Sequence, residues 1–441
     1  MPTAHTALRR DLFPRSEVVQ LAITLQRIAL WWQRTWACPK GDLARSKFHL
    51  PRRGVLRCVP GPFVVCHAEE LMNRDYPSYD DVPYHSRWRH FEAGGVDRTA
   101  RLKIAWDGSK NCDSIEQARR LVDLVTTSVL LDAGAGDVWK YTEKSTGFEA
   151  GRSEGLGVAS FHMFGAGAFS SDPRAAPHRA DSVGLKGLAD DSVRTAFQVD
   201  DDSNPLVGCD GRTQVLQRLG TALEQHPEYF ETAGLFRPGN MVDYLLSQAD
   251  PDTKTVSITK VWEVVMYGFE AMWPAGRTEL DGRSMGDVWP HSALPDDGSG
   301  WSNLVPFHKL SQWMTYSLME PLQQAAGLVL TDTELMTGLP EYRNGGLLLD
   351  MGLLQAKHAD VTGKPHGPEE EVIVEWRALT VCLLDEIATA LRKKLGKTEA
   401  EFPLVKLLEG GTWKAGRYMA KMLRPQTCGP PIVIVSDGTV F

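Results

Sequence analysis

Apolar residues recur at three- and four-residue spacing along most of the chain, which is the pattern of a helix with one buried face. The clearest stripe consists of Ile115, Ala118, Val122, Val125 and Val129. Ser114 and Gln117 have the spacing of a capping box before this stripe, and Gly134 ends it. Comparable patterns predict helices at about 213–225, 257–272, 306–326 and 372–395. The sequence therefore predicts a mainly α protein with a multi-helix globular body.

Strand patterns are few and short. The C-terminal run "PPIVIVSDGTVF" at 430–441 is the clearest, and Val372 to Val374 form a weaker candidate. Before residue 75 the chain has one amphipathic pattern, at 16–37, and then little periodicity. We therefore expect an atypical N-terminal arm at 1–74 with one amphipathic helix, followed by a single helical domain at 75–441. A sub-division of that domain near 205–255 is an open alternative.

Composition narrows the class of function. The chain has 441 residues, of which 42% are apolar and 24% charged, as in an average soluble protein. Its formal charge of -8 provides no basic surface for nucleic acid, and polar residues interrupt segment 16–37 too often for a membrane span. We expect a small-molecule substrate, with neither nucleic acid nor membrane as a partner, and the oligomeric state stays open.

Seven cysteines are scattered along the chain, and none forms a C-x-x-C pair. This spacing argues against a disulfide framework, a zinc ribbon and a redox dithiol, and it favours a reducing compartment such as the cytoplasm. Neither glycine-rich segment, 131–139 nor 164–169, completes the G-x-G-x-x-G of a dinucleotide site. The sequence predicts no metal and no cofactor.

The segment "TGLPEYRNGGLLLD" at 337–350 places Glu341, Tyr342 and Arg343 between a proline and two glycines. Because these flanking residues fix or bend the backbone and an apolar run follows, we expect the triplet on a fixed loop against a core. Such a loop can form the edge of a pocket. It can also be a tight turn whose charges face water.

Residues 82–98 gather basic groups, including His85 and Arg87, among tryptophan and phenylalanine. Such a mixture can bind a small polar ligand while excluding water, or it can form a buried salt-bridge network. His85 and His90 are five residues apart and do not share a helical face, so no metal is expected here. Asp132, at the end of an apolar helix, is expected to pair or cap near the following loop.

Two later segments place polar groups on predicted helices. Lys309, Gln312 and Tyr316 share one face, which is either a solvated stripe or a wall that binds a ligand. Glu375 and Arg377 lie inside the apolar run 372–384. A charge in such a run is costly unless it is paired or functional.

The order of several unusual motifs points to a family. They are "YHSRWRHFEAGG", "LLDAGAG", "GRSEGL", "FSSDP", "NPLVGCDGR", "GDVW", "LVPFHKLSQW", "TGLPEYRNGG", "VEWRALTV", "LEGGTW" and "VSDGTVF". From about residue 84 to the C-terminus this set resembles the uracil catabolism protein 4 family, whereas residues before about 75 depart from its pattern. The resemblance implies a role in the pyrimidine-degradation route that proceeds through ribosylurea and ends in urea release.

A fainter resemblance concerns the blocks "FHKLSQ", "LPEYRNGG" and "EVIVEWRA". They are similar to blocks of the queuosine-salvage nucleosidases, which are largely helical and resemble helix-hairpin-helix DNA glycosylases. Glu341 stands where that family has an aspartate, and Leu310 and Ser311 replace its Arg-Ala. This similarity implies the same helical fold with a few short strands.

Together the resemblances imply that the domain at 75–441 is a metal-independent hydrolase that releases urea from the N-glycosidic bond of ribosylurea or its phosphate. The predicted catalytic carboxylates are Glu341, Asp287 and Glu375. The predicted substrate-binding residues are His85, Arg87, His308, Lys309, Gln312, Tyr342, Arg343 and Arg377. The alternatives are an enzyme that acts on another ureido intermediate of the same route and a non-catalytic, glycosylase-like binding protein.

Overall fold

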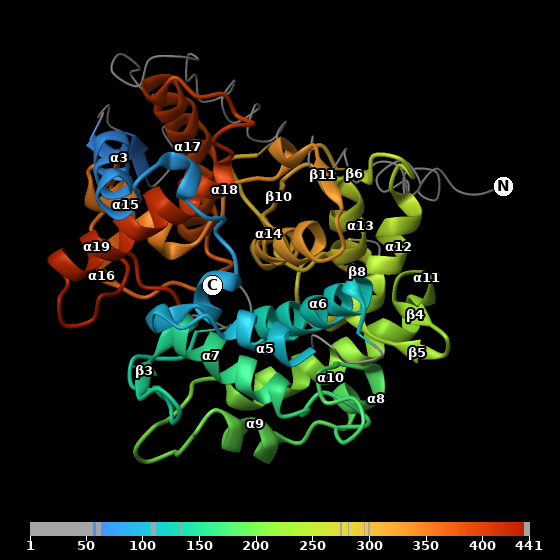
Figure 1. Cartoon of the computed structure of the whole chain (residues 1–441). Coiled ribbons are helices and arrows are strands. Elements are labelled where there is room, and N and C mark those ends of the chain that lie inside the picture. Colours follow the sequence, from blue (N-terminus) through green and yellow to red (C-terminus); the bar gives the residue numbers. More distant parts are fainter. Residues whose placement is uncertain are drawn as a thin grey trace. The chain divides into compact units, whose positions relative to one another are not determined.

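The computed structural model describes residues 56–58, 63–106, 112–132, 134–273, 276–280, 282–294, 296–298 and 300–435 (Figure 1). The helix predicted at 16–37 and residues 436–441 of the predicted C-terminal strand lie outside this part. The described residues of that predicted strand form no strand, only an isolated bridge between Ile434 and His366. Among the described residues, no helix has both the length and the apolar character needed to cross a bilayer.

The described chain is mainly helical, and its strands form short two-stranded sheets. It divides into two compact units. Unit 1 comprises the described residues of 56–85, Gly276–Gln312 and Asp332–Val435, and unit 2 those of Ser86–Ala275 and Trp313–Thr331. Helix α14 (Lys309–Gln324) begins in unit 1 and ends in unit 2. The single domain expected at 75–441 stays a prediction.

Unit 1 draws its helices from separate stretches of the sequence. They are α3 (Phe63–Asp75), η1 (Tyr79–Asp81), the first turn of α14, η5 (Thr333–Leu335), α15 (Tyr342–Asp350), α16 (Asp360–Gly363), α17 (Glu371–Leu395), α18 (Leu404–Lys406), the π-helix η6 (Leu407–Trp413) and α19 (Lys414–Leu423). Its antiparallel strand pairs are β1 (Leu56–Cys58) with β12 (Leu354–Ala356), β7 (Glu279–Leu280) with β8 (Arg283–Ser284), and β9 (Val288–Pro290) with β10 (Leu304–Pro306).

Helix α15 is buried within unit 1, because it packs against α17, η6 and α19. Gly416 of α19 permits this close approach, since a side chain there would collide with the carbonyl oxygen of Arg343. Helix α17 begins after Glu370 and ends at Gly396, which has a left-handed φ of 65°. The two helices thus hold the start of α15 between well-defined neighbours.

Unit 2 is also helical. Its helices are α4 (Trp88–Phe91), η2 (Ala93–Gly95), α5 (Arg98–Trp106), α6 (Ser114–Leu130), α7 (Arg152–Gly165), α8 (Ser182–Lys186), α9 (Asp190–Ala196), α10 (Cys209–Gln225), α11 (Pro227–Phe230), η3 (Pro238–Asn240), α12 (Met241–Gln248), α13 (Ile258–Gly268), η4 (Glu270–Met272) and the rest of α14. Its strand pairs are the antiparallel β2 (Tyr141–Glu143) with β3 (Phe148–Ala150) and β4 (Glu231–Thr232) with β5 (Leu235–Phe236), and the parallel β6 (Thr255–Ser257) with β11 (Val329–Thr331).

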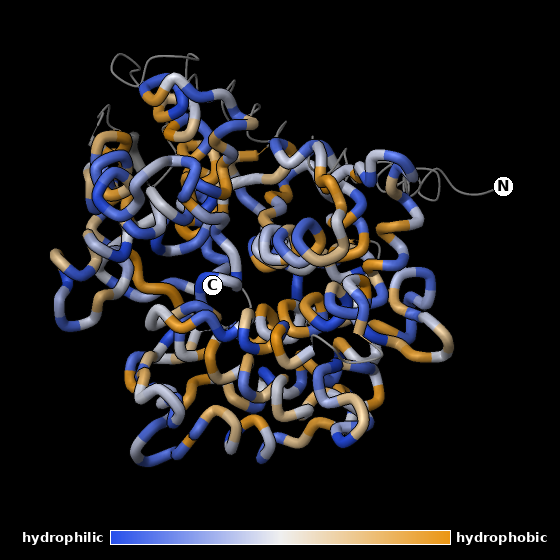
Figure 2. Tube along the Cα trace, in the orientation of Figure 1, coloured by the Kyte–Doolittle hydropathy of each residue, from blue (hydrophilic) through white to orange (hydrophobic). Residues whose placement is uncertain are grey.

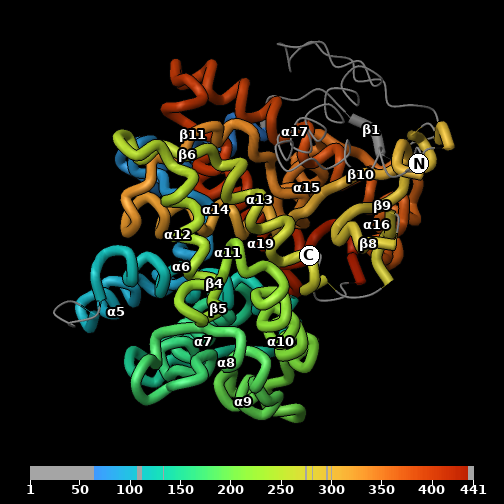
Figure 3. The backbone as a smooth tube through the Cα atoms, turned by 90° about the vertical axis from the view of Figure 1, so that its right-hand side faces the viewer, coloured from blue at the N-terminus to red at the C-terminus, as the bar shows by residue number. Residues whose placement is uncertain are grey.

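The core of unit 2 forms around α6 and α10. Helix α10 packs against α8 and α9 (Figures 1 and 3), and α6 packs against α7, α12 and η3. Apolar and polar positions intermix along the trace of these helices (Figure 2), as expected when one face is buried. Leu121, Val125 and Leu216 are fully buried on those faces.

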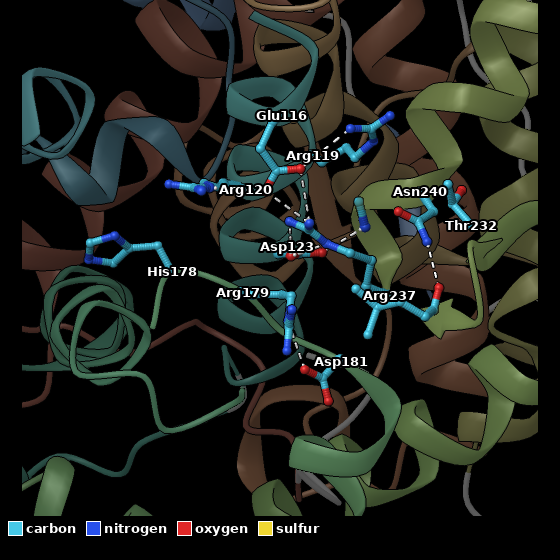
Figure 4. Close-up of polar contacts among 12 residues, drawn as sticks. Glu116, Arg119, Arg120, Asp123, His178, Arg179, Asp181, Thr232, Arg237 and Asn240 are labelled. Atoms are coloured by element: carbon cyan, nitrogen blue, oxygen red, sulfur yellow. Dashed lines mark hydrogen bonds and ion pairs between the residues drawn. The ribbon is translucent and has the colours of Figure 1, made fainter. Parts of the chain in front are cut away.

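A buried carboxylate, Asp123 of α6, joins unit 2 internally (Figure 4). Arg237 Nε donates to Asp123 Oδ2 at 2.9 Å, Gly239 N to Oδ1 at 2.7 Å and Ala180 N to Oδ2 at 3.1 Å. Burial raises the pKa of Asp123 to about 6, although Arg237 and the two backbone donors oppose it. The carboxylate ties α6 to η3 and to the loop before α8.

The five helices predicted from periodicity are confirmed as α6, α10, α13, α14 and α17. The cap of α6 differs from the prediction, because Asp113 and not Ser114 is the N-cap and accepts from Glu116 N. The weak strand at Val372 to Val374 was wrong, since these residues form the first turn of α17. Part of the arm predicted at 1–74 lies in helix α3 (Phe63–Asp75), in which Ala68 is fully buried.

Candidate functional site

A buried ion pair between Asp287 and Arg377 lies inside unit 1. Arg377 Nη1 and Nη2 each donate to one carboxylate oxygen of Asp287 at 2.7 Å, and the two residues are 1% and 2% exposed. Trp289 Nε1 and Lys309 N also donate to this carboxylate, at 2.8 and 3.0 Å. Burial alone would raise the pKa of Asp287, but the charge and hydrogen bonds of Arg377 outweigh it and lower the pKa to about 2.

Arg377 connects three segments that are far apart in the sequence. Its Nε donates to the carbonyl oxygen of Pro340 at 3.2 Å, and its guanidinium lies 4.1 Å from the centroid of the Phe307 ring. Gln312 makes a second link, because its Oε1 accepts from Thr337 N at 3.3 Å. The segments "FHKLSQ", "LPEYRNGG" and "EVIVEWRA" therefore meet in unit 1.

His308 lies beside this pair in an unusual backbone conformation. Its φ of 47° is in the left-handed region, which is rare for a residue with a side chain and is often found at functional sites. The residue is 2% exposed. Burial lowers the pKa of His308 to about 4, with Asp287 acting against this shift and Arg377 with it. The imidazole is therefore neutral at neutral pH.

Glu341 is the N-cap of α15. Its Oε1 accepts from Asn344 N at 2.8 Å and its Oε2 from Arg343 N at 3.1 Å. Glu341 is 7% exposed and Arg343 is 6% exposed, so the alternative of a turn with charges facing water is wrong. Each carboxylate oxygen keeps a second lone pair that can accept from or attract a ligand.

Tyr342 and Arg343 line a small open pocket of unit 1. The same pocket is bounded by Gly346 of α15, Gly416 of α19 and Arg424. Arg424 is held by Asp350, because its Nη1 donates to Asp350 Oδ1 at 2.9 Å. The pocket thus has small residues along its helices and charged groups at its edges.

A second polar cluster surrounds Trp413, which ends the π-helix η6. The guanidinium of Arg343 lies 5.2 Å from the centroid of the indole ring, that of Arg417 lies 4.9 Å away, and the His85 ring lies 5.3 Å away. His85 Nδ1 and Glu409 Oε2 are 2.7 Å apart. Both residues are buried, at 5% and 6% exposed. This cluster adjoins the pocket through Arg343.

The other predicted residues divide between the units. Glu375 is 1% exposed on α17 and Lys309 begins α14, both in unit 1. Gln312 is 2% exposed, which contradicts a solvated stripe at that position. Arg87 is the exception among the predicted site residues, because it belongs to unit 2.

Arg87 forms a buried network in unit 2. It is fully buried, its Nη1 lies 3.2 Å from Asp132 Oδ2, and its Nε donates to Ser128 Oγ at 2.6 Å. The guanidinium also lies 5.6 Å from the centroid of the Trp313 ring. These contacts favour the salt-bridge interpretation of Arg87 and confirm that Asp132 pairs near its loop.

Sequence reasoning missed Glu409, Trp413 and Arg417. The motif "LEGGTW" contains the first two, but nothing in its spacing indicated that they meet His85 or Arg343. The described residues contain no group of histidine, cysteine, aspartate and glutamate side chains arranged to hold a metal ion.

Comparison with known proteins identifies the family. Residues 62–441 match the family described as "Protein of unknown function (DUF1688)". "Uracil catabolism protein 4" of Lachancea kluyveri is 41% identical over 394 residues, which cover 84% of this chain and 88% of that protein. The chain belongs to the uracil catabolism protein 4 family. "Protein urg3" of Schizosaccharomyces pombe is 40% identical over 383 residues, or 86% of this chain and 90% of that protein.

This family match confirms the predicted resemblance, and it begins at residue 62 rather than near residue 84. It therefore includes α3, which packs against η6 in unit 1. The range of the family match thus covers the segments that build both the Asp287–Arg377 pair and the Trp413 cluster.

Proposed function

We propose that this protein is a hydrolase that cleaves the N-glycosidic bond of ribosylurea, or of its phosphate, and releases urea. The name of the relative "Uracil catabolism protein 4" supports a role in uracil breakdown. The observation that carries the proposal is the meeting of three nucleosidase-like segments at Arg377, which binds Asp287 and Pro340 and stacks on Phe307.

Glu341 would be the carboxylate nearest the reacting sugar carbon. Breaking the C1–N bond develops positive charge on the sugar, and a fixed negative group stabilises that charge or activates water. The backbone N–H groups of Arg343 and Asn344 hold the carboxylate, and Arg377 holds Pro340 immediately before it. Such a group needs little rearrangement when substrate arrives.

The leaving nitrogen of urea needs a proton, and Asp287 does not suit that role. With a pKa of about 2, its carboxyl is ionised at neutral pH. We therefore revise the prediction for Asp287 and assign it to positioning, because it holds Arg377 and the start of α14. Glu375 stays a candidate for a catalytic role.

Tyr342 and Arg343 would contact the sugar or its phosphate, since both line the pocket and follow Glu341 directly in the sequence. An arginine can bind phosphate through its planar fork and can equally pair with a buried acid.

The test is to incubate purified protein with ribosylurea and with ribosylurea 5-phosphate. Released urea and reducing sugar are both measured. The proposal predicts urea and sugar in a 1:1 ratio from at least one substrate. Release of ammonia instead of urea would favour the alternative of a different ureido reaction. No turnover of either compound would contradict the proposal.

A further inference from the structure

We propose that His85 and Glu409 form a proton-transfer pair in which His85 donates the proton to the leaving urea nitrogen. This inference rests on the proposed function and adds the acid that Asp287 cannot supply. It assigns a role to Glu409, a residue that the sequence did not single out.

The geometry of the pair orients the imidazole. A carboxylate accepts hydrogen bonds and does not donate them, so the 2.7 Å contact places a proton on His85 Nδ1 that is donated to Glu409 Oε2. The other nitrogen, Nε2, makes no hydrogen bond to any described residue. A histidine held in this way by a carboxylate presents one defined nitrogen for proton transfer, and the carboxylate stabilises the charged ring.

The pair lies in the same cluster as the predicted substrate-binding residues. His85 and Arg343 contact the ring of Trp413, at 5.3 and 5.2 Å from its centroid. Arg343 also lines the pocket with Tyr342. Arg343 would therefore contact a ligand in that pocket. It also shares the Trp413 ring with His85 and lies two residues after Glu341.

The local fold places Glu409 for this task. Glu409 lies in the π-helix η6, a form that is rare and occurs frequently at functional sites. Gly410, the next residue, packs so closely that a side chain would approach Val82 to 2.7 Å. Glu409, Trp413 and Arg417 follow one another at four-residue spacing and all belong to the cluster around His85.

The proposed step balances as follows. The C1–N bond breaks and its electron pair goes to nitrogen, which takes the proton from His85 Nε2. Water bonds to C1 and releases a proton to Glu341, from which it passes to solvent, and His85 regains a proton from solvent. The sum is the substrate plus water giving the sugar and urea, with no oxidant or metal.

Several charged groups surround the pair. Glu409 accepts from His85 Nδ1, and the guanidinium groups of Arg343 and Arg417 lie next to the same indole. On the other side of Glu409, Lys414 Nζ donates to Tyr76 Oη at 2.6 Å, and both groups interact electrostatically with Glu409.

The first experiment uses His85→Ala, with His358→Gln as a control because His358 is exposed in the same unit. We expect His85→Ala to lower kcat for urea release by about a hundredfold, in line with losses for positioned acid-base groups, and added imidazole to restore part of it. His358→Gln should keep the wild-type rate. Circular dichroism establishes that each variant is folded.

The second experiment tests Glu409 as a positioning residue. Glu409→Gln removes the carboxylate that accepts from His85 Nδ1 and orients the ring, so kcat should fall while KM stays close to the wild-type value, and Glu409→Asp should keep part of kcat. A purely structural role for Glu409 would lower stability and leave kcat per folded molecule unchanged.

The outcomes separate the two proposals. If wild-type protein releases no urea from either ribosylurea substrate, the proposed function itself fails. If wild-type protein is active and folded His85→Ala is within threefold of it, only the present inference is overturned. A loss in His85→Ala that imidazole does not reverse also overturns it, because the histidine then acts through binding or packing.

Discussion

Each unit contains a buried aspartate–arginine pair, and the two pairs differ in what surrounds them. Asp123 and Arg237 in unit 2 belong to a network of backbone donors that joins α6 to neighbouring loops. Asp287 and Arg377 in unit 1 lie beside the strained His308, and Arg377 also holds the peptide before Glu341. The pKa of Asp123 is raised to about 6 and that of Asp287 is lowered to about 2.

The comparison shows that buried aspartate–arginine pairs can have different roles. A raised pKa means that burial outweighs the partner, as in a structural contact that the fold can tolerate. A lowered pKa means that the partner's charge dominates and the pair stays ionised over the working pH range. Unit 1 therefore keeps a fixed, charged arginine next to its candidate catalytic loop.

The largest expected effect is on ribosylurea turnover, which should depend on the Asp287–Arg377 pair and not on the Asp123–Arg237 pair. Arg377→Lys keeps the charge but loses the planar fork that holds both Asp287 and Pro340, so Glu341 should shift from its place. We expect turnover of ribosylurea to fall about a hundredfold in the folded variant. Arg237→Lys, the matched change in unit 2, should leave turnover per folded molecule unchanged. Equal losses of turnover in Arg377→Lys and Arg237→Lys would contradict the view that only the pair in unit 1 supports activity.

The next effect concerns stability, in which the two pairs should be alike. Asp287→Asn and Asp123→Asn each leave a buried arginine without its full counter-charge, and we expect each to lower the free energy of unfolding by about 3–5 kcal/mol. Urea titration followed by circular dichroism measures this, with the exposed Asp252→Asn as a control near zero. A loss below about 1 kcal/mol at either site would show that the pair adds little to stability.

The pH dependence of these two losses should have opposite sign. The pKa of Asp287 is below its ordinary value of 3.8, so its contribution is present above that value and is lost as pH falls toward 2. The pKa of Asp123 is above 3.8, so the folded state gains stability as pH falls from about 6 to 4. Each change amounts to about 2–3 kcal/mol.

Urea titrations of wild-type and variant protein across these two pH windows test the prediction. The cost of Asp287→Asn should shrink on acidification, and the cost of Asp123→Asn should grow. The same direction of change in both variants would contradict it.

The smallest effect concerns the helix caps. Asp113 caps α6 in unit 2 as Glu341 caps α15 in unit 1. Asp113→Ala should lower the free energy of unfolding by about 1 kcal/mol and leave turnover unchanged, because it removes a cap and nothing else. A drop in turnover would show that cap loss alone, even outside unit 1, affects activity.

The helical fold could be predicted from the sequence because apolar periodicity reports local structure directly. Helices α6 and α17 follow their apolar stripes, and Gly396 ends α17 as expected. The strand at Val372 to Val374 was mistaken because a short apolar run reads equally as strand or buried helix. The arm prediction overlooked α3, which is shorter than the predicted helices α6, α14 and α17.

The site was predictable only in part. Segment 337–346 could be singled out from its proline and glycines, but the expected loop was wrong for Tyr342 and Arg343, which form the first turn of α15. Lys309 and Arg377 were recognised as polar groups on predicted helices, and the resemblances gave them roles. The Asp287–Arg377 pair joins residues 90 apart, and the His85–Glu409 pair joins residues 324 apart. No local pattern encodes such contacts. The role of Asp287 changed for the same reason, because its pKa depends on a partner that the sequence does not place.

The most direct test of the central claim is urea release by Glu341→Asn. Asparagine is itself a preferred N-cap, so α15 should keep its start and Tm should stay near that of the wild type, while the negative charge is lost. Glu341→Asp keeps both cap and charge and should remain partly active. We predict that Glu341→Asn lowers kcat for ribosylurea by about a hundredfold or more. A folded Glu341→Asn that releases urea at close to the wild-type rate would contradict the account.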